Sequence, residues 1–474
     1  MDFSGLTLTK FIANFITQML DSWRTTAKDF LRYLPVLTLR KLLVVWVLLA
    51  VFVNLLIEAG FKLDVARYFP ISEFYGPTIH VSGLPYAALF LIVFFLALKH
   101  VSRFNLLQVW LIGLVLIVLG NLAQGSVDAA FYKPLYGHGG QYYHDAIRVT
   151  DWRQWLSDFN ANQTQLQNHS QTHPPFAVLL QYLLLEIGNR HLLILAGAFV
   201  LLSSLSIILI WQILQESDLP APRSSQLALL FAVIPAFNIY SAVSLEGVVA
   251  ALSTLFLLGV IKIVRRGMSW LGMLVFSAGL LLANLLTFGG TFLPATAFLI
   301  GMREMLVKKR FGVLIALLVS LLLGVLVYVI MLRSFGYDHL EAFLTAARYE
   351  NPEGFRALHV PLDYVMTRIE GVAEIALFLS LGALAVLFHQ DHLKLRIGAF
   401  HDEITSIFLA GALSLLLMLL VGAFKTGETA RICLFIYPYI MLVLRKLEDA
   451  TLHAVTIFAG LQTIIMQTFG GYFW

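Results

Sequence analysis

The sequence predicts an all-α integral membrane protein with about 13 transmembrane helices. Of its 474 residues, 59% are hydrophobic and only 13% are charged, and the mean hydropathy is +0.82. A soluble domain carries about 25% charged and about 45–50% apolar residues. The apolar residues also gather in runs close to the roughly 20 residues that a spanning helix needs. We therefore expect a single transmembrane domain over residues 1–474, with lipid as the solvent for much of its surface.

Thirteen apolar runs are candidates for these spans. They cover residues 42–59, 84–99, 105–123, 191–215, 225–242, 245–264, 269–287, 289–303, 311–332, 369–388, 404–423, 432–445 and 452–470. A further apolar run, 176–187, is short for a segment that has to cross about 30 Å of hydrocarbon. Whether it crosses decides which loops share a side of the membrane.

The distribution of basic residues answers this question. If 176–187 does not cross and the N-terminus is cytoplasmic, 20 of the 32 Lys and Arg lie on the cytoplasmic side. If it crosses, the dense basic clusters at 262–266 and 303–310 move outside, against the positive-inside rule. The sequence thus predicts a cytoplasmic N-terminus, an outer C-terminus and two long outer loops, 124–190 and 333–368.

Residues 1–40 begin with an amphipathic pattern that predicts a cytoplasmic interfacial helix.

The formal net charge of +4 is small, and the basic residues fall in short clusters between apolar runs. That pattern fits membrane topology and predicts no nucleic-acid partner. The single cysteine, Cys433, excludes a disulfide framework and a cysteine-based metal site.

The first long outer loop holds side chains suited to chemistry. Tyr143 and Asp145 precede a His-Pro-Pro turn at 173–175, which opens the short apolar run. Because prolines suit the first turn of a helix, 175–187 is expected to be a helix lying at the outer surface. Carboxylates, imidazoles and aromatic rings beside the positive end of that helix could receive an anionic headgroup. An ordinary solvated loop is the alternative.

An acidic residue amid tyrosines, followed by a His-Pro-Pro turn that opens a surface helix, resembles the first outer loop of GT-C glycosyltransferases. That superfamily includes protein O-mannosyltransferases and lipid A aminoarabinose transferases. The run Pro235…Tyr240…Glu246 and the segment 427–438 also resemble recurring GT-C patterns. This sequence departs from the family in two ways. Ala146 stands where many members carry a second acid, and the loop follows the third predicted span rather than the first.

The resemblance implies a GT-C-like fold and a transferase that takes a sugar from a polyprenyl-phosphate or polyprenyl-diphosphate carrier. The sugar would pass, with inversion, to a hydroxyl of a lipid, glycan or protein acceptor on the outer face. A prokaryotic cytoplasmic membrane is expected, since no eukaryotic retention tail is visible. No cofactor is required; a divalent metal at Asp128 or Asp145 is compatible with the sequence but not indicated by it.

Sugar transfer needs a base for the acceptor and cations for the leaving phosphate. A positioned base typically contributes about 10²–10⁴-fold, and Asp145 is the first candidate, with Asp128 as the second. The residues expected to bind substrate or phosphate are His173, Arg431, Lys425, Glu246, Glu428, Arg333 and Tyr143. Arg431 is favoured among the cations because a guanidinium matches phosphate oxygens bidentately. Glu246 stands out because ionisable groups at the membrane edge are costly.

Each candidate also has a purely structural interpretation. The aspartates could cap helices, His173 could hydrogen-bond its own turn, and Arg431 could be an interfacial arginine paired with Glu428. Glu246 suits the N-terminal turn of the span that follows it. In the second outer loop, 340–349 is expected to form a short amphipathic helix in a mobile flap over the site.

Two other functions remain open. A transporter or flippase for lipid-linked sugars would use intramembrane acids and interrupted helices, such as those at 287–290 and Pro294. However, no internal repeat relates two halves of the chain, and the acids cluster on the outer side. A polymerase or ligase of surface polysaccharide would share the outer active side with a transferase.

Overall fold

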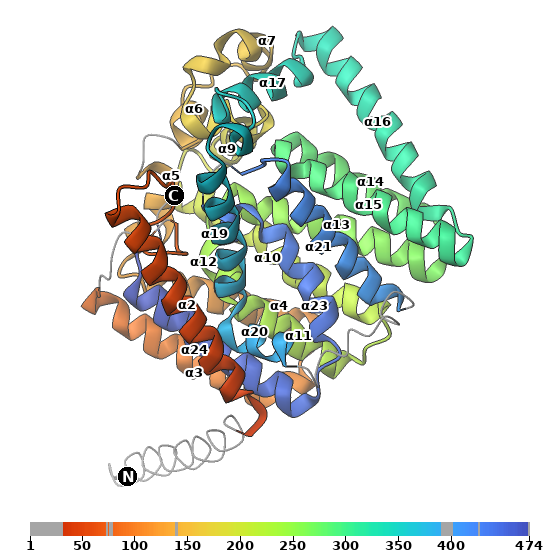
Figure 1. Cartoon of the computed structure of the whole chain (residues 1–474). Helices are drawn as coiled ribbons and strands as arrows, with labels where there is room; N and C mark the ends of the chain where they lie inside the picture. The colour runs from red at the N-terminus through yellow and green to blue at the C-terminus, as the bar shows by residue number, and fades with distance from the viewer. Residues whose placement is uncertain are drawn as a thin grey trace, which may run out of the picture.

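Each of the thirteen apolar runs contains a helix or a pair of helices in the computed structural model of the protein (Figure 1). The structure describes residues 32–72, 74, 79–137, 141–389, 402–424 and 427–472. The helices of the apolar runs are α2 (Val36–Glu58), α3 (Leu84–His100), α4 (Leu106–Leu122), α10 (Leu192–Glu216), α11 (Ala221–Val233) with α12 (Pro235–Tyr240), α13 (Leu245–Arg266), α14 (Trp270–Leu286), α15 (Phe292–Arg303), α16 (Gly312–Phe335), α19 (Pro361–Leu379) with α20 (Leu381–Phe388), α21 (Glu403–Leu420), α23 (Tyr437–Leu444) and α24 (Asp449–Phe469). The predicted interfacial helix at 1–40 falls mostly on residues outside the described ranges.

Seven of the described helices are long and apolar enough to cross a membrane, or eight if α19 and α20 form one span. The chain is therefore an all-α integral membrane protein, but the predicted count of 13 is not confirmed. Several predicted spans are short, since α4 and α14 have 17 residues each and α15 has 12. Others are broken. α12 restarts at Pro235, which lacks the N–H of a continuing helix, and α19 and α20 meet at 104°.

The apolar run 176–187, which the sequence predicts not to cross, forms helix α9 (Phe176–Ile187). At about 1.5 Å per residue its 12 residues extend about 18 Å, well below the roughly 30 Å of a hydrocarbon core. It packs beside α10, α14 and α6 (Tyr143–Ala146), and Figure 1 shows α6 and α9 at the same end of the molecule. α9 by itself is too short to cross the hydrocarbon core, and its place at the outer surface remains a prediction.

The two long loops predicted on the outer side pack against each other. They contain α7 (Trp152–Asn162) and α17 (His339–Glu350), respectively. The Asp338 N–H donates to the side-chain oxygen of Asn160 at 2.9 Å, which joins the two loops. Figure 1 shows α6, α7, α9 and α17 gathered at the top of the view. The loops that carry most of the candidate chemistry therefore share one end of the bundle.

The basic clusters gather at the end of the bundle where α21 begins. Glu403, at the start of α21, lies 2.6 Å from Lys308 and 3.4 Å from Arg265. Its neighbour Asp402 lies 3.1 Å from Arg445. Loops that the sequence placed together on the cytoplasmic side are thus held together by ion pairs. That this end faces the cytoplasm remains a prediction.

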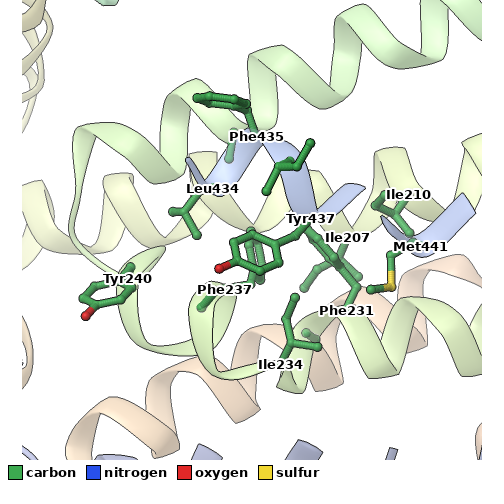
Figure 2. Packing of buried hydrophobic residues seen from close by; sticks show 14 of the residues in the cluster. Ile207, Ile210, Phe231, Ile234, Phe237, Tyr240, Leu434, Phe435, Tyr437 and Met441 are labelled. Carbon is green, nitrogen blue, oxygen red and sulfur yellow. The ribbon is translucent and has the colours of Figure 1, made fainter. Parts of the chain in front are cut away.

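The core beside the candidate site is built around the broken helix α11–α12. Figure 2 shows Phe231 and Phe237 of this helix next to Tyr437 of α23. The rings of Phe231 and Phe237 are 4.3 Å apart, and Tyr437 is fully buried. At the break, Asn238 donates its amide N–H to the Ala232 carbonyl at 3.1 Å, which satisfies a backbone group that the interrupted helix exposes. The chain then turns from α12 into the first residues of α13, where the site begins.

Candidate functional site

A buried arginine lies between two carboxylates where the first turn of α13 meets the short helix α22 (Thr429–Ile432). Arg431 is only 3% exposed, and its guanidinium binds Glu428 and lies 3.5 Å from the carboxylate of Glu246. We call Glu246, Glu428 and Arg431 the outer charge cluster, after the side of the membrane on which the sequence predicts them. Because burying an unpaired charge is costly, these pairs hold the three side chains in one arrangement.

The local sequence accounts for both sides of the outer charge cluster. Ser244 caps α13 by accepting a backbone N–H at 2.9 Å, and the helix N-terminus favours the negative charge of Glu246. On the other side, Gly427 has φ +28° and approaches Ser72 so closely that a Cβ would come within 3.0 Å of it. Only glycine fits there, and the tight turn leaves Glu428 in left-handed backbone conformation.

The His-Pro-Pro turn reaches the same place. His173 Nδ1 lies 3.0 Å from the His169 carbonyl, so Nδ1 carries the proton and Nε2 is left as an acceptor. Burial lowers the pKa of His173 to about 4, while the nearby charge of Glu246 raises this pKa and that of Arg431 lowers it. The imidazole is therefore neutral at neutral pH and lies within the field of the outer charge cluster.

The ring of Tyr142 packs against the ring of His173. The two rings meet edge to face with centroids 5.3 Å apart, and the His169 ring lies 5.5 Å away. Tyr142 is 4% exposed, yet its hydroxyl has no hydrogen-bond partner among the described residues. Burial, with the charge of Glu246 nearby, raises the pKa of Tyr142, so the hydroxyl keeps its proton. Such a hydroxyl is free to donate to a ligand or to an ordered water.

Asp145 is buried on α6, where it holds the outer loop together. Its Oδ2 accepts the Gln167 N–H at 2.9 Å, and Arg148 lies 3.6 Å from its Oδ1. The hydrogen bond draws the segment that carries His169 toward α6, where Tyr142 meets it. This geometry suits a positioning residue, whereas the role of general base remains a prediction.

Several other predicted site residues have different surroundings. Asp128 accepts a hydrogen bond from the Tyr136 hydroxyl at 2.6 Å, and Tyr143 is half-buried. Arg333 is exposed on the last turn of α16, and Lys425 lies outside the described residues. Among the predicted site residues, Arg431 pairs with Glu246 and Glu428, and His173 lies near enough for Glu246 and Arg431 to influence its pKa.

No protein-family model and no curated protein matches the chain. Two crystal structures are similar to it: ArnT from Cupriavidus metallidurans bound to undecaprenyl phosphate, and the same protein in the apo state. The first is 12% identical in sequence, and the match covers 68% of this chain and 77% of that one with a TM-score of 0.27. The second is 14% identical, with coverages of 67% and 73% and a TM-score of 0.26. Identities and TM-scores this low establish neither a family nor a function.

A metal site does not emerge from the part of the chain that the structure describes. Within it, no three His, Cys, Asp or Glu side chains are grouped so that they could hold a metal ion. Asp128 and Asp145, the two aspartates considered as metal ligands, bind different partners. The outer charge cluster contains a cation of its own, Arg431, which is paired with the two carboxylates.

Three residues next to the outer charge cluster escaped the sequence analysis. Tyr142, rather than the predicted Tyr143, packs on His173. Adjacent helical residues point about 100° apart, and nothing local in the sequence selects which of two tyrosines faces inward. Glu374 carried a usable signal, since a carboxylate inside an apolar run is costly and has a partner or a function. Ser72, which contacts both Glu374 and the Glu428 backbone, belongs to no motif.

Proposed function

We propose that this protein is a membrane glycosyltransferase that moves a sugar from a polyprenyl-phosphate or polyprenyl-diphosphate carrier to an acceptor hydroxyl. The observation that carries the proposal is the buried Arg431 between two carboxylates, with the unpartnered Tyr142 hydroxyl nearby. The guanidinium supplies a cation for a phosphate, a carboxylate supplies an acceptor for a proton, and the phenol supplies a hydrogen bond to a ligand. The resemblance of the loop motifs to GT-C transferases adds the substrate class.

In the proposed reaction, the phosphate of the carrier displaces Glu428 from Arg431. A guanidinium fork suits phosphate oxygens, and Glu428 is the more accessible of the two carboxylates. Its side chain is 26% exposed, against 10% for Glu246. Glu246 therefore stays paired with Arg431 and holds the guanidinium in place while the substrate is bound.

The released Glu428 then acts as the general base. It takes the proton of the acceptor hydroxyl while the acceptor oxygen bonds to the anomeric carbon from the face opposite the phosphate. The bond from that carbon to the phosphate oxygen breaks, and its electron pair stays on the phosphate, where Arg431 stabilises the developing charge. The anomeric configuration inverts. Asp145 is the alternative base, and the same experiment compares the two.

Purified protein in lipid nanodiscs, given undecaprenyl phosphate that carries a radiolabelled sugar, tests this proposal. We expect labelled acceptor and free lipid phosphate, and we expect Glu428→Gln to lower turnover by about 10²–10⁴-fold while the protein stays folded. A loss of that size in Asp145→Asn, with Glu428→Gln near normal, would assign the base to Asp145. Movement of the intact lipid across a bilayer without cleavage would instead support a flippase. The proposed setting is the outer face of a prokaryotic cytoplasmic membrane.

A further inference from the structure

One carboxylate of α19 connects three separate parts of the chain. Glu374 is fully buried, and its Oε1 accepts the Ser72 N–H at 3.0 Å and the Ser72 hydroxyl at 2.7 Å. Its Oε2 lies 2.9 Å from the Thr429 hydroxyl and 3.3 Å from the Ala430 N–H. Glu374 therefore joins α19 both to the loop after α2 and to the segment that carries Arg431.

Ser72 and Thr429 extend this connection to the outer charge cluster. The Ser72 hydroxyl donates its single proton to Glu374 and accepts the N–H of Glu428. The Thr429 hydroxyl can donate to Glu374 or to the Gly371 carbonyl at 2.8 Å, and both acceptors belong to α19. The residues that directly precede Arg431 are thus held by contacts that lead back to one helix and mainly to one carboxylate.

Two further acidic residues of α19 hold the same loop at other points. Glu370 accepts the Ala66 N–H at 2.7 Å, and Asp363 accepts the Asp64 N–H at 2.6 Å. Positions 363, 370 and 374 share one face of a helix with 3.6 residues per turn, so the loop lies along that face. Of the three, Glu374 alone bonds to residues 427–432 within the described part of the chain. Glu370 is therefore a natural control for Glu374.

We propose that Glu374 is a positioning residue for Arg431. Its carboxylate holds Ser72, Thr429 and Ala430 and thereby fixes the position and direction of α22. The position of α22 in turn sets the distance between the Arg431 guanidinium and the Glu246 carboxylate. Hydrogen bonds to a carboxylate are stronger than those between neutral groups, which makes this site an effective anchor. The inference rests on the proposed function only for the substrate that Arg431 would bind.

Hydrogen exchange of the full chain in nanodiscs, comparing Glu374→Gln with Glu370→Gln, tests the proposal. A glutamine at 370 can keep the backbone bond through its amide oxygen, whereas at 374 its NH₂ faces groups that were donors. We expect the amides of 427–432 to exchange at least about tenfold faster in Glu374→Gln and at the wild-type rate in Glu370→Gln. Equal exchange in 427–432 for the two variants would overturn the proposal.

Ser72→Ala is a milder second variant if Glu374→Gln does not fold. It removes the hydroxyl between Glu374 and the Glu428 N–H without adding a polar group to a buried site. Faster exchange confined to 427–432 and the residues around position 72 supports the positioning role. Wild-type exchange in 427–432 contradicts it.

Kinetics with the lipid-linked sugar separate positioning from general damage. We expect Glu374→Gln to raise the KM for the donor about tenfold, with a smaller change in kcat, and Glu374→Asp to recover part of the loss. If exchange changes as expected but the wild type transfers no sugar, the proposed function fails and the positioning role stands. If the wild type transfers sugar and Glu374→Gln changes neither exchange nor KM, the positioning role alone fails.

Discussion

Replacing Arg431 with methionine would leave Glu246 and Glu428 without their shared cation. Removing one partner of a buried ion pair costs about 3–5 kcal/mol, because the remaining charge is left uncompensated. Glu246 is only 10% exposed and would keep an uncompensated charge, whereas Glu428 can become hydrated because 26% of its side chain is exposed. Only one of the two carboxylates therefore contributes the full cost. We therefore expect a loss at the lower end of that range, about 3 kcal/mol in the free energy of unfolding, or roughly 100-fold in the equilibrium constant.

Unfolding in SDS, followed by circular dichroism on the purified protein, measures this loss. The matched control is Arg333→Met, which removes an exposed arginine and should change the free energy of unfolding by less than about 0.5 kcal/mol. The double variant Arg431→Met/Glu246→Gln should recover about 1–2 kcal/mol, because it also removes the uncompensated charge. A single variant as stable as the control, or a double variant no more stable than the single one, would refute the paired-charge reasoning.

Three further predictions concern pH, the backbone and topology. Because burial holds the pKa of His173 near 4, below its ordinary 6.5, its contribution to stability is complete above pH 6.5 and is lost as the pH falls to 4. His173→Gln should flatten that part of a plot of Tm against pH, and an unchanged plot would contradict the assignment. Gly427→Ala should lower the free energy of unfolding, measured by thermal denaturation, by about 1–3 kcal/mol because the new Cβ would clash with Ser72. Its control is Gly354→Ala, which is also at positive φ but in open space and should lose less. Equal losses in the two variants would exclude the clash. In a Cys433→Ser background, an impermeant maleimide should label Asn162→Cys in intact cells but Lys309→Cys only after permeabilisation, and the reverse pattern would invert the predicted topology.

Hydropathy and the count of basic residues determined most of the elements. All thirteen apolar runs hold helices, and the run 176–187 forms the short helix α9. The helix expected at 340–349 falls within α17. These features depend on sums over neighbouring residues, which a sequence displays directly. The helices break at Pro235 and at Ser380, inside apolar runs, so hydropathy does not reveal these interruptions and does not fix the number of spans.

Tertiary structure decided which polar groups meet. Glu246 and Arg431 belong to helices far apart in the chain, and their 3.5 Å approach depends on the depth and rotation of α13 and α22. Tyr142 packs on His173, whereas its neighbour Tyr143 packs on another ring, because packing selects one of two directions about 100° apart. The sequence by itself therefore determined an all-α membrane protein and its candidate loops, since those follow from local composition. The site was decided by long-range packing, since a charge finds its partner only when two helices are placed in space.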